Sequence, residues 1–533
     1  MVRRQSMASN PTETSRSQHH HHRHRHHVVV VVLGDAGRSP RMSYHALSLL
    51  QDGSDVTLVG YDGSPLLPQL TEFGRGGTES RFTFRPIPHH PSNAALNAFK
   101  PLKALFQLVS LFAVLFRCTA SAGYDGSPAD VLLLQIPPAI PTMLVCIIVA
   151  FVRRMRLVFD WHNFGHSLMG YGGDGRRGAG EGVLQRVARL YETGLGPMAH
   201  GNLCVTDAMG RELKDVYRGT LATTFYDRPR QDVFTGRTDV GAGVALLSRF
   251  VEDERRERST RSDSALVVRC LQLVMDRMQG EDWRGGGDGG GRTQGMGGRR
   301  KVVNATSTAC RITSKSAGRR NNHSKRWQNA VADQVDQVDH GKREALLMVS
   351  STSWTPDEDF SILLDAMVRY DGRAASHAAL PCVLLFVTGK GPLKEYYLQK
   401  IDRLELSHVA IRTVWLEPDD YPRLLGCADL GVSLHASSSG VDLPMKVVDM
   451  FGAQTPVAAL GYPCLAEEMV VDGKNGVVFE SSEELCERLE AMLADDWQGL
   501  RGMQRYVRGQ SDRGYERWEE AWQRVARGVI LGG

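Results

Sequence analysis

The sequence predicts an α/β protein with two doubly wound domains, on three observations. Short aliphatic runs recur along the chain, at residues 28–33, 382–387 and 430–434, and their length and composition are typical of buried parallel strands. A turn rich in glycine or serine follows each run. A stretch that can form a helix comes next, which gives the strand–helix–strand alternation of a parallel sheet.

The first domain is predicted to cover residues 28–230. Its expected strands are residues 28–33, 55–61, 81–86, 131–135, 156–160 and 202–206, and its expected helices are residues 41–51, 142–152, 182–199 and 207–217. Residues 1–27 end in a histidine- and arginine-rich run and are expected to be a disordered low-complexity tail. The six apolar residues 28–33 are too few for the apolar core of a secretory signal.

The second domain is predicted to cover residues 344–533. Its expected strands are residues 345–350, 382–387, 411–414, 430–434, 456–459 and 475–479, and its last helix is expected to pack back on the first domain. Between the domains, residues 231–343 are predicted to be a flexible insertion and linker, because residues 283–300 are nearly all glycine and arginine. A single helix over residues 265–278 is the ordered element expected there.

Composition excludes some classes of function. A net charge of +4 over 533 residues gives no indication of a nucleic-acid-binding protein. Nine scattered cysteines without zinc-site spacing indicate reduced thiols. The apolar stretches 102–116 and 142–152 are too short to span a bilayer comfortably, and two interpretations stay open: packed core, or contact with a membrane surface with Arg153 and Arg154 at headgroup level.

Two turns in the second domain have the composition of an anion-binding site. The small residues 436–440 follow strand 430–434, and a helix begins after Pro444, where free N–H groups favour phosphate. Residues 388–391 form a glycine turn after strand 382–387. The two turns indicate a nucleotide at the carboxyl ends of parallel strands, and an ordinary βα turn is the alternative. Neither turn has the spacing of a Walker loop or a dinucleotide fingerprint, which disfavours ATP hydrolysis and dinucleotide redox chemistry.

A polar cluster follows the predicted strand 156–160. Asp160, Trp161, His162, Asn163 and His166 lie at the carboxyl end of this strand, where α/β enzymes place their chemistry. A hydrogen-bonded turn with a stacking tryptophan is the structural alternative.

Four long sequence segments indicate a particular protein family. GDAGRSPRMSYHALSL (34–49), LVFDWHNFGHSLMG (157–170), TGKGPLKEYY (388–397) and WLEPDDYPRLLGCADLGVSLHASSSGVDLPMKVVDMFG (415–452) closely resemble the chitobiosyldiphosphodolichol β-mannosyltransferase family of N-glycan assembly. The resemblance covers most of residues 28–230 and 344–527. It implies a GT-B glycosyltransferase, in which two Rossmann-like domains face each other across a cleft.

The resemblance implies transfer of mannose from GDP-mannose to chitobiose on dolichyl diphosphate, at the cytosolic face of the endoplasmic reticulum membrane. The new β-1,4 bond inverts the α-linked donor, and no cofactor or bound metal is expected. The expected partners are the two substrates, the membrane surface and other mannosyltransferases of the same pathway. Family members usually begin with an apolar anchor, and because none precedes Val28 we expect peripheral attachment.

Roles are then assigned to single residues. The residues expected to bind the donor are Ser353, Trp354, Thr388, Gly389, Lys390, Gly391, Ser438, Ser439, Gly440, Asp442, Leu443, Lys446 and Asp449. Those expected to bind the acceptor and its diphosphate are Gly34, Arg38, Ser39, Arg41, Trp161 and Asn163. The catalytic base is expected among His162, Asp35 and Asp160, in the order His162 before Asp35.

One departure from a related pattern supports inversion. Many related retaining enzymes carry two glutamates seven residues apart. Alignment on residues 443–444 and 455–457 places Ser439 and Asp449, which are ten positions apart here, opposite these glutamates. The first carboxylate is therefore missing, and Asp449 is left to hold the ribose. Two other functions remain as alternatives: a non-catalytic binding or scaffold protein with the same fold, and a different lipid-linked mannosyltransferase.

Overall fold

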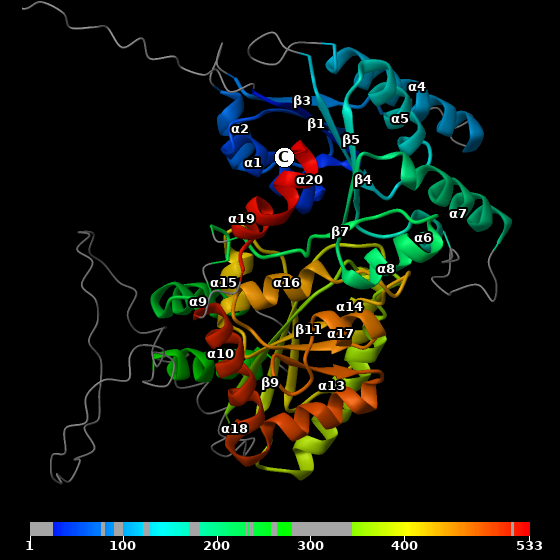
Figure 1. Ribbon diagram of the computed structural model, residues 1–533. Helices are drawn as coiled ribbons and strands as arrows, with labels where there is room; N and C mark the ends of the chain where they lie inside the picture. The colour runs from blue at the N-terminus through cyan, green and yellow to red at the C-terminus, as the bar shows by residue number, and fades with distance from the viewer. Residues whose placement is uncertain are drawn as a thin grey trace, which may run out of the picture. The chain divides into compact units, whose positions relative to one another are not determined.

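The computed structural model describes residues 25–75, 80–89, 100–120, 128–169, 182–230, 232–234, 236, 238–256, 264–279, 344–512 and 516–532. It contains two parallel sheets with helices on both faces, as Figure 1 shows, which confirms the predicted fold class. The chain divides into two compact units, residues 1–134 with 144–157 and residues 135–143 with 158–533. This division falls inside the first sheet, whereas the sequence placed the domain boundary after residue 230. The predicted tail 1–27 lies almost wholly outside the described residues.

The first sheet has the strand order β3-β2-β1-β4-β5-β6-β7. Its strands are β1 (His27–Asp35), β2 (Asp55–Tyr61), β3 (Phe82–Pro86), β4 (Val131–Ile136), β5 (Arg156–Trp161), β6 (Gly201–Cys204) and β7 (Thr223–Thr224). The helices among them are α1 (Pro40–Gln51), α2 (Pro68–Gly74), α4 (Lys100–Cys118), α5 (Thr142–Arg153), α6 (Gly165–Leu168), α7 (Val183–Leu195) and α8 (Asp207–Val216). Residues 28–31 pair in parallel with residues 56–59 and 131–134, and this central position explains an uninterrupted valine run.

The second sheet has the strand order β10-β9-β8-β11-β12-β13. Its strands are β8 (Ala345–Ser351), β9 (Cys382–Thr388), β10 (Val409–Val414), β11 (Leu430–Ser433), β12 (Val457–Leu460) and β13 (Gly476–Phe479). The helices that follow its strands are α13 (Phe360–Ser376), α14 (Lys394–Ile401), α15 (Asp420–Cys427), α16 (Met445–Gly452), α17 (Pro463–Glu468) and α18 (Ser482–Asp512), the last interrupted by non-helical residues 494–497. The strand order reverses between β8 and β11, and open α/β sheets bind ligands at such a point.

Part of the predicted flexible insertion is ordered: the helix expected over residues 265–278 is confirmed, whereas the prediction of a flexible segment is wrong for residues 240–256. These residues form helices α9 (Val240–Arg256) and α10 (Ser264–Gln279). Leu247, Leu271 and Val274 are fully buried in one core cluster with Leu347 and Val349 of β8. Alternate β8 residues, Leu346 and Met348, belong to the core cluster on the opposite face with α13 and α18. The two helices therefore cover one face of the second sheet, because their apolar residues recur at helical spacing.

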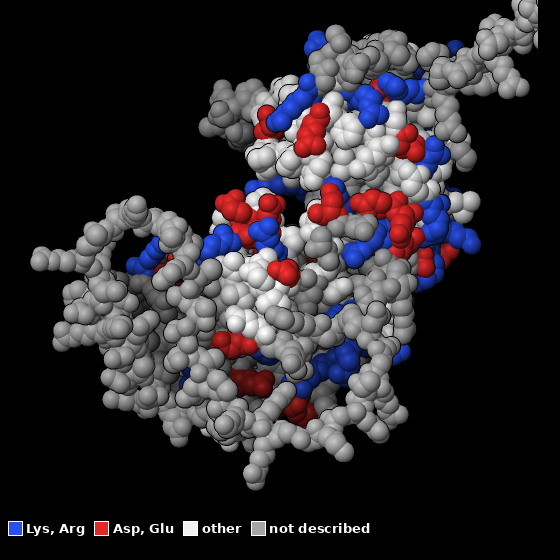
Figure 2. Space-filling view, turned by 90° about the vertical axis from the view of Figure 1, so that its left-hand side faces the viewer, with Lys and Arg blue, Asp and Glu red and all other residues white. Residues whose placement is uncertain are grey.

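The C-terminal segment returns to elements of the first sheet. Helix α19 (Trp518–Ala521) continues through a π-helical turn (Trp522–Ala526) into α20 (Arg527–Leu531). The ring of Trp518 lies 4.8 Å from that of Phe225, and its backbone N–H donates to the Pro229 carbonyl. Glu516, just before α19, forms ion pairs with Arg228 and Arg524. On the face of the molecule in Figure 2, acidic and basic side chains lie intermixed.

No helix in the described ranges is both long enough and apolar enough to cross a bilayer. The eight described cysteines are free thiols, and all are buried.

Candidate functional site

The loops that leave β8 and β9 touch at the carboxyl edge of the second sheet. Gly389 has a φ of +119°, and a Cβ there would lie 1.9 Å from the Thr352 carbonyl oxygen. A Cβ on Gly391 would lie 1.7 Å from the Ser353 carbonyl oxygen. Glycine is therefore required at both positions because two backbones approach closely, and not only to admit a ligand.

Lys446, near the start of α16 (Met445–Gly452), forms an ion pair with Glu358 in the β8–α13 loop. The Glu358 carboxylate also accepts from the Thr352 hydroxyl at 2.9 Å and from the Ser353 amide at 2.5 Å. Burial would raise the pKa of Glu358, but the Lys446 ammonium beside it holds that pKa below its usual value. The lysine is thus fixed beside the Ser353 hydroxyl, 3.4 Å from its Nζ.

A chain of hydroxyl groups leads to Asp449. The Thr388 hydroxyl donates to Ser351 at 3.2 Å, Ser351 and Tyr421 hydroxyls lie 3.1 Å apart, and Tyr421 donates to the Asp449 carboxylate at 3.3 Å. Burial is the main cause that raises the pKa of Asp449, to about 7. Asp449 is only partly accessible, and its hydrogen bonding to Tyr421 leaves it able to accept further donors.

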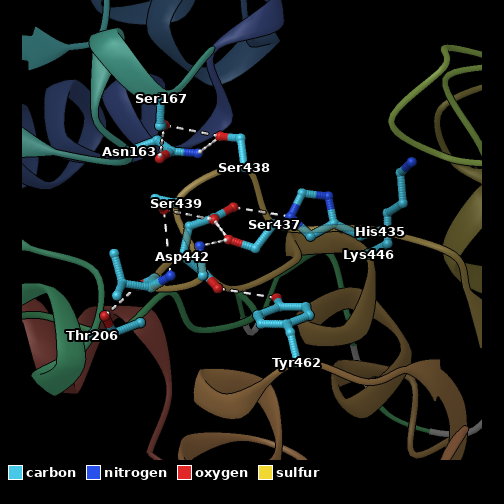
Figure 3. Close-up of polar contacts among 12 residues, drawn as sticks. Asn163, Ser167, Thr206, His435, Ser437, Ser438, Ser439, Asp442, Lys446 and Tyr462 are labelled. Atoms are coloured by element: carbon cyan, nitrogen blue, oxygen red, sulfur yellow. Dashed lines mark hydrogen bonds and ion pairs between the residues drawn. The ribbon is translucent and has the colours of Figure 1, made fainter. Parts of the chain in front are cut away.

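Asp442 organises the small-residue turn after β11, as Figure 3 shows. Its carboxylate accepts from His435 Nε2 at 2.9 Å, from the Ser439 hydroxyl at 3.3 Å and from the Ser437 hydroxyl. Burial would raise the pKa of Asp442, but the hydrogen bond from His435 lowers it below its usual value. Asp442 was expected to bind the donor directly, and in the structure its carboxylate instead accepts hydrogen bonds from within the turn. Gly440 in the same turn has a φ of +79°.

Lys390 and Trp415 form a cation–π pair beyond β9 and β10. The Lys390 Nζ lies 3.5 Å from the centre of the Trp415 ring, and this tryptophan is 62% exposed. A flat, accessible ring with an ammonium at its face can receive a purine base or a phosphate.

The loop after β5 carries the first-ranked base. Asp160 is fully buried, and His162 Nε2 lies 2.9 Å from its carboxylate oxygen. A carboxylate accepts only, so this contact assigns the imidazole proton to Nε2 and leaves Nδ1 as the proton acceptor. Within the described residues His162 Nδ1 has no hydrogen-bond partner.

This loop contacts the small-residue turn of the second sheet within one compact unit (Figure 3). The Asn163 amide donates to the Ser438 hydroxyl at 3.2 Å, and the Ser167 hydroxyl lies 3.0 Å from the same oxygen. Thr206 donates to the Val441 carbonyl at 2.5 Å. Asn163 was expected at the acceptor, and the structure places its amide on the predicted donor turn.

A second histidine–carboxylate pair supports the loop from behind. Glu192 of α7 is fully buried and accepts from the Gly165 amide at 2.8 Å. Its other oxygen lies 2.8 Å from His166 Nδ1, and Tyr217 donates to it at 3.4 Å. Helix α7 therefore holds the loop that presents His162.

The turn after β1 belongs to the other compact unit. Asp35 accepts from the Ser64 hydroxyl at 2.6 Å, the Ser64 amide at 3.0 Å and the Gly37 amide at 3.1 Å. Burial would raise the pKa of Asp35, but these hydrogen bonds and Arg38 lower it, which makes the carboxylate a weaker base. Arg38 is largely exposed, with its Nε 3.4 Å from Asp35, and Gly34 and Ser39 flank it in the turn.

Four predicted site residues are buried or partly buried in the packing of the sheets and helices. Trp161 is fully buried, and its indole donates to Asn202 at 3.0 Å, so it packs the core and does not face an acceptor. Trp354 is buried against Phe360, and its indole donates to the Gly389 carbonyl. Arg41 is buried on α1, and Leu443 is partly buried against the core of the second sheet.

Sequence reasoning missed four residues of the site: Glu358, His435, Trp415 and Glu192. Asp359 caps α13, and its neighbour Glu358 turns inward to Lys446. The signal for His435 was its position two residues beyond the end of β11. Glu192 and Trp415 gave no signal, because their partners are distant in sequence.

Comparison with known proteins identifies the family. The family of glycosyl transferases group 1 matches residues 343–495. Mouse chitobiosyldiphosphodolichol beta-mannosyltransferase is 35% identical over 92% of this chain and 86% of its own length. The human protein of the same name is 33% identical over 94% and 92%, and UDP-glycosyltransferase TURAN of Arabidopsis thaliana is 35% identical over 94% and 96%.

Solved structures agree on the fold. Sucrose-phosphate synthase from Thermosynechococcus elongatus superposes with a TM-score of 0.54 at 10% identity, over 95% of this chain and 97% of its own. Anabaena HepE, in complex with UDP and glucose, gives 0.53 at 12% identity, over 94% and 98%. The two sheets are thus those of the GT-B fold, and the whole-length similarity shows that this chain belongs to the chitobiosyldiphosphodolichol beta-mannosyltransferase family of glycosyltransferases.

Proposed function

We propose that this chain transfers mannose from GDP-mannose to chitobiose on dolichyl diphosphate and forms a β-1,4 bond. The observation that carries the proposal is the whole-length similarity to the mouse and human proteins named for this reaction. The geometry of the second sheet supports it, because two fixed lysines and a half-buried carboxylate lie at the carboxyl edge where α/β sheets bind nucleotides.

The donor diphosphate is assigned to the turns after β9 and β11. Lys446 lies at the first turn of α16, where free N–H groups also favour an anion. Lys390 and Lys446 stabilise the negative charge that develops as GDP leaves. Both ammonium groups are already in position, so no rearrangement is needed during the reaction. Asp449 accepts hydrogen bonds from the ribose hydroxyls, and Trp415 stacks on the guanine.

His162 is the proposed base for the acceptor hydroxyl. Asp160 orients its ring, and Nδ1 takes the proton as the sugar hydroxyl attacks the anomeric carbon from the face opposite the departing diphosphate. One displacement of this kind inverts the anomeric carbon. The loop that carries His162 also touches Ser438 of the donor turn, which supports a base near the donor.

Two further parts of the proposal concern metal and location. Transfer is expected to proceed without a bound metal ion, since lysines and backbone N–H groups meet the charge of the diphosphate. The enzyme is expected at the cytosolic face of the endoplasmic reticulum membrane, beside other mannosyltransferases of the same pathway. In α4 and α5 the exposed residues Leu105, Val109, Phe151 and Val152 support attachment to a membrane surface.

The deciding experiment is transfer in vitro with GDP-mannose and a chitobiosyl-diphosphate lipid. Mannose incorporation with a β-1,4 linkage, unchanged by EDTA, is the expected result. An α linkage would establish a different mannosyltransferase, and GDP binding without turnover would establish a non-catalytic scaffold. Because one relative is named a UDP-glycosyltransferase, UDP-glucose and UDP-N-acetylglucosamine are tested beside GDP-mannose, and a preference for either would overturn the donor assignment.

A further inference from the structure

Helix α7 presents an apolar stripe to solvent. Four of its residues are highly exposed: Val183 at 78%, Leu184 at 66%, Val187 at 52% and Leu190 at 69%. Residues 183, 187 and 190 follow the i, i+4, i+7 spacing that places side chains on one face of a helix. Met198, just beyond the helix, adds a further exposed apolar side chain. Amphipathic helices normally turn such a stripe toward the core, and α7 turns it outward.

The opposite face of α7 is firmly packed, so its outward stripe is not a sign of a loose helix. Ala188 and Glu192, which share that face at i and i+4, are buried. Glu192 holds Gly165 and His166 through the hydrogen bonds described above, and the Tyr191 hydroxyl donates to the Pro141 carbonyl at 3.4 Å. The orientation of α7 is therefore fixed with respect to the loop that carries His162.

Charge on α7 is entirely basic at the surface. Arg186 and Arg189 are exposed along one edge of the stripe, and Glu192, the one acidic residue of the helix, is buried. Apolar side chains flanked by arginines, without an exposed acid, are typical of helices that lie in the interface of a bilayer with anionic lipids.

A second copy of the chain fits this surface poorly. A helix of 13 residues offers a stripe of about 20 Å by 10 Å, or about 200 Å². Stable interfaces bury about 800 Å² on each partner, and a two-fold contact through this stripe would bring like-charged arginines together. A lipid surface can bind a stripe of this small area, and its anionic headgroups attract the arginines beside it.

We propose that the outward stripe of α7 lies in the surface of a bilayer, with Val183, Leu184, Val187 and Leu190 at the boundary of headgroups and acyl chains. Arg186 and Arg189 contact lipid phosphates. The inference rests on the proposed function, because a lipid-linked acceptor presents its sugars at such a surface. Since Glu192 joins α7 to the loop after β5, this contact sets the height of His162 above the bilayer.

The first test is co-sedimentation of the full chain with vesicles of phosphatidylcholine, with and without phosphatidylserine. The variant Leu184→Asp/Val187→Asp/Leu190→Asp is expected to lower the partition coefficient by about tenfold or more, from the apolar area no longer buried. Leu221→Asp, at a 75% exposed leucine outside the stripe, is the matched control and should partition like the wild type. Arg186→Glu/Arg189→Glu should weaken binding only to the anionic vesicles.

A label test does not depend on the triple variant folding. Val187→Cys carrying an environment-sensitive fluorophore should shift its emission to the blue on vesicles, and Leu221→Cys should not. Equal partition of the triple variant and the wild type, or no shift at position 187, would overturn the inference.

Different experiments test the membrane contact of α7 and the proposed function, so one can be contradicted while the other stands. Transfer to a short-chain acceptor dissolved in detergent tests the function without a bilayer, and the triple variant is expected to keep it. If the wild type binds vesicles through α7 but shows no transfer in detergent, the proposed function fails and the membrane contact stands.

Discussion

At the scale of single residues, hydrogen bonding and burial separate the candidate bases. Asp35 accepts hydrogen bonds from Ser64 and Gly37, and its pKa is lowered despite burial, so it holds a proton poorly. His162 has one ring nitrogen fixed by buried Asp160 and the other available as an acceptor. Asp160 itself is fully buried, so its role is to orient His162.

We expect His162→Ala to lower kcat by about 10²–10⁴-fold, the usual contribution of a positioned base, with GDP affinity nearly unchanged. Asp160→Asn should also lower kcat, because the amide can donate to the ring and reverse its tautomer. His377→Ala, at an exposed histidine that ends α13, is the matched control. A His162→Ala enzyme that keeps more than about a tenth of the wild-type kcat would remove His162 from this role.

The pair of Lys446 and Glu358 gives a prediction for binding and stability together. Lys446→Ala should weaken GDP binding by about 1–3 kcal/mol, through loss of a charged hydrogen bond. It should also destabilise the fold by about 3–5 kcal/mol, because buried Glu358 then has no cation beside it. Titration calorimetry and urea unfolding measure the two effects.

The double variant Lys446→Ala/Glu358→Gln separates these effects. Removing the buried charge should restore much of the stability, while GDP binding stays weak. If the double variant binds GDP as tightly as the wild type, Lys446 has only a structural role.

Asp449 makes GDP binding dependent on pH. Its pKa is raised to about 7, so near pH 6 the free protein carries the proton, and stability from this group is lost as pH rises through 7. Ribose hydroxyls that donate to the carboxylate favour its ionised form, so GDP binding near pH 6 should release about one proton. Calorimetry in buffers of different ionisation enthalpy measures this release. Asp449→Asn should abolish it, and an unchanged release would place the titrating group elsewhere.

At the scale of elements, the sequence predicted the strands better than their contacts. Uninterrupted apolar runs such as residues 28–33 and 382–387 predict parallel strands that are buried on both faces. A strand with one face in solvent would instead alternate apolar and polar residues. The partners of Glu358 and Glu192 could not be predicted, since residues 88 and 26 positions away meet them. Trp161 and Trp354 were expected at the substrates, and both are buried, because a strand end carries core side chains as well as functional ones.

Helix α9 was missed, and α10 was expected only as a lone helix in a flexible segment, because glycine- and arginine-rich residues follow them and dominate the composition of the whole segment. Leu271→Ala, at a fully buried position in α10, should cost about 2–5 kcal/mol of unfolding free energy. Gln272→Ala, on the exposed face of the same helix, should cost little. Urea midpoints measure both, and an unchanged midpoint for Leu271→Ala would mean that α10 is not part of the core of the second sheet.

At the scale of the whole molecule, each compact unit has its own exposed apolar helix face. In the first unit, α5 exposes Phe151 at 83%, and the Arg153 guanidinium lies 4.1 Å above the ring of Phe116 in α4. In the second unit the corresponding face is the stripe of α7. Neither face is large enough alone for a permanent anchor, since a single shallow insertion gives reversible binding.

We therefore expect attachment to be peripheral and reversible. Each face gains from burying a few side chains, and the lipid charge attracts the arginines beside them, so high salt should weaken binding without abolishing it. Alkaline carbonate should release the protein from microsomes, while Phe151→Asp should lower vesicle binding and leave transfer in detergent unchanged. Protein that stays in the pellet after carbonate would require an integral anchor, and binding unaffected by Phe151→Asp would leave attachment to α7 without help from α5.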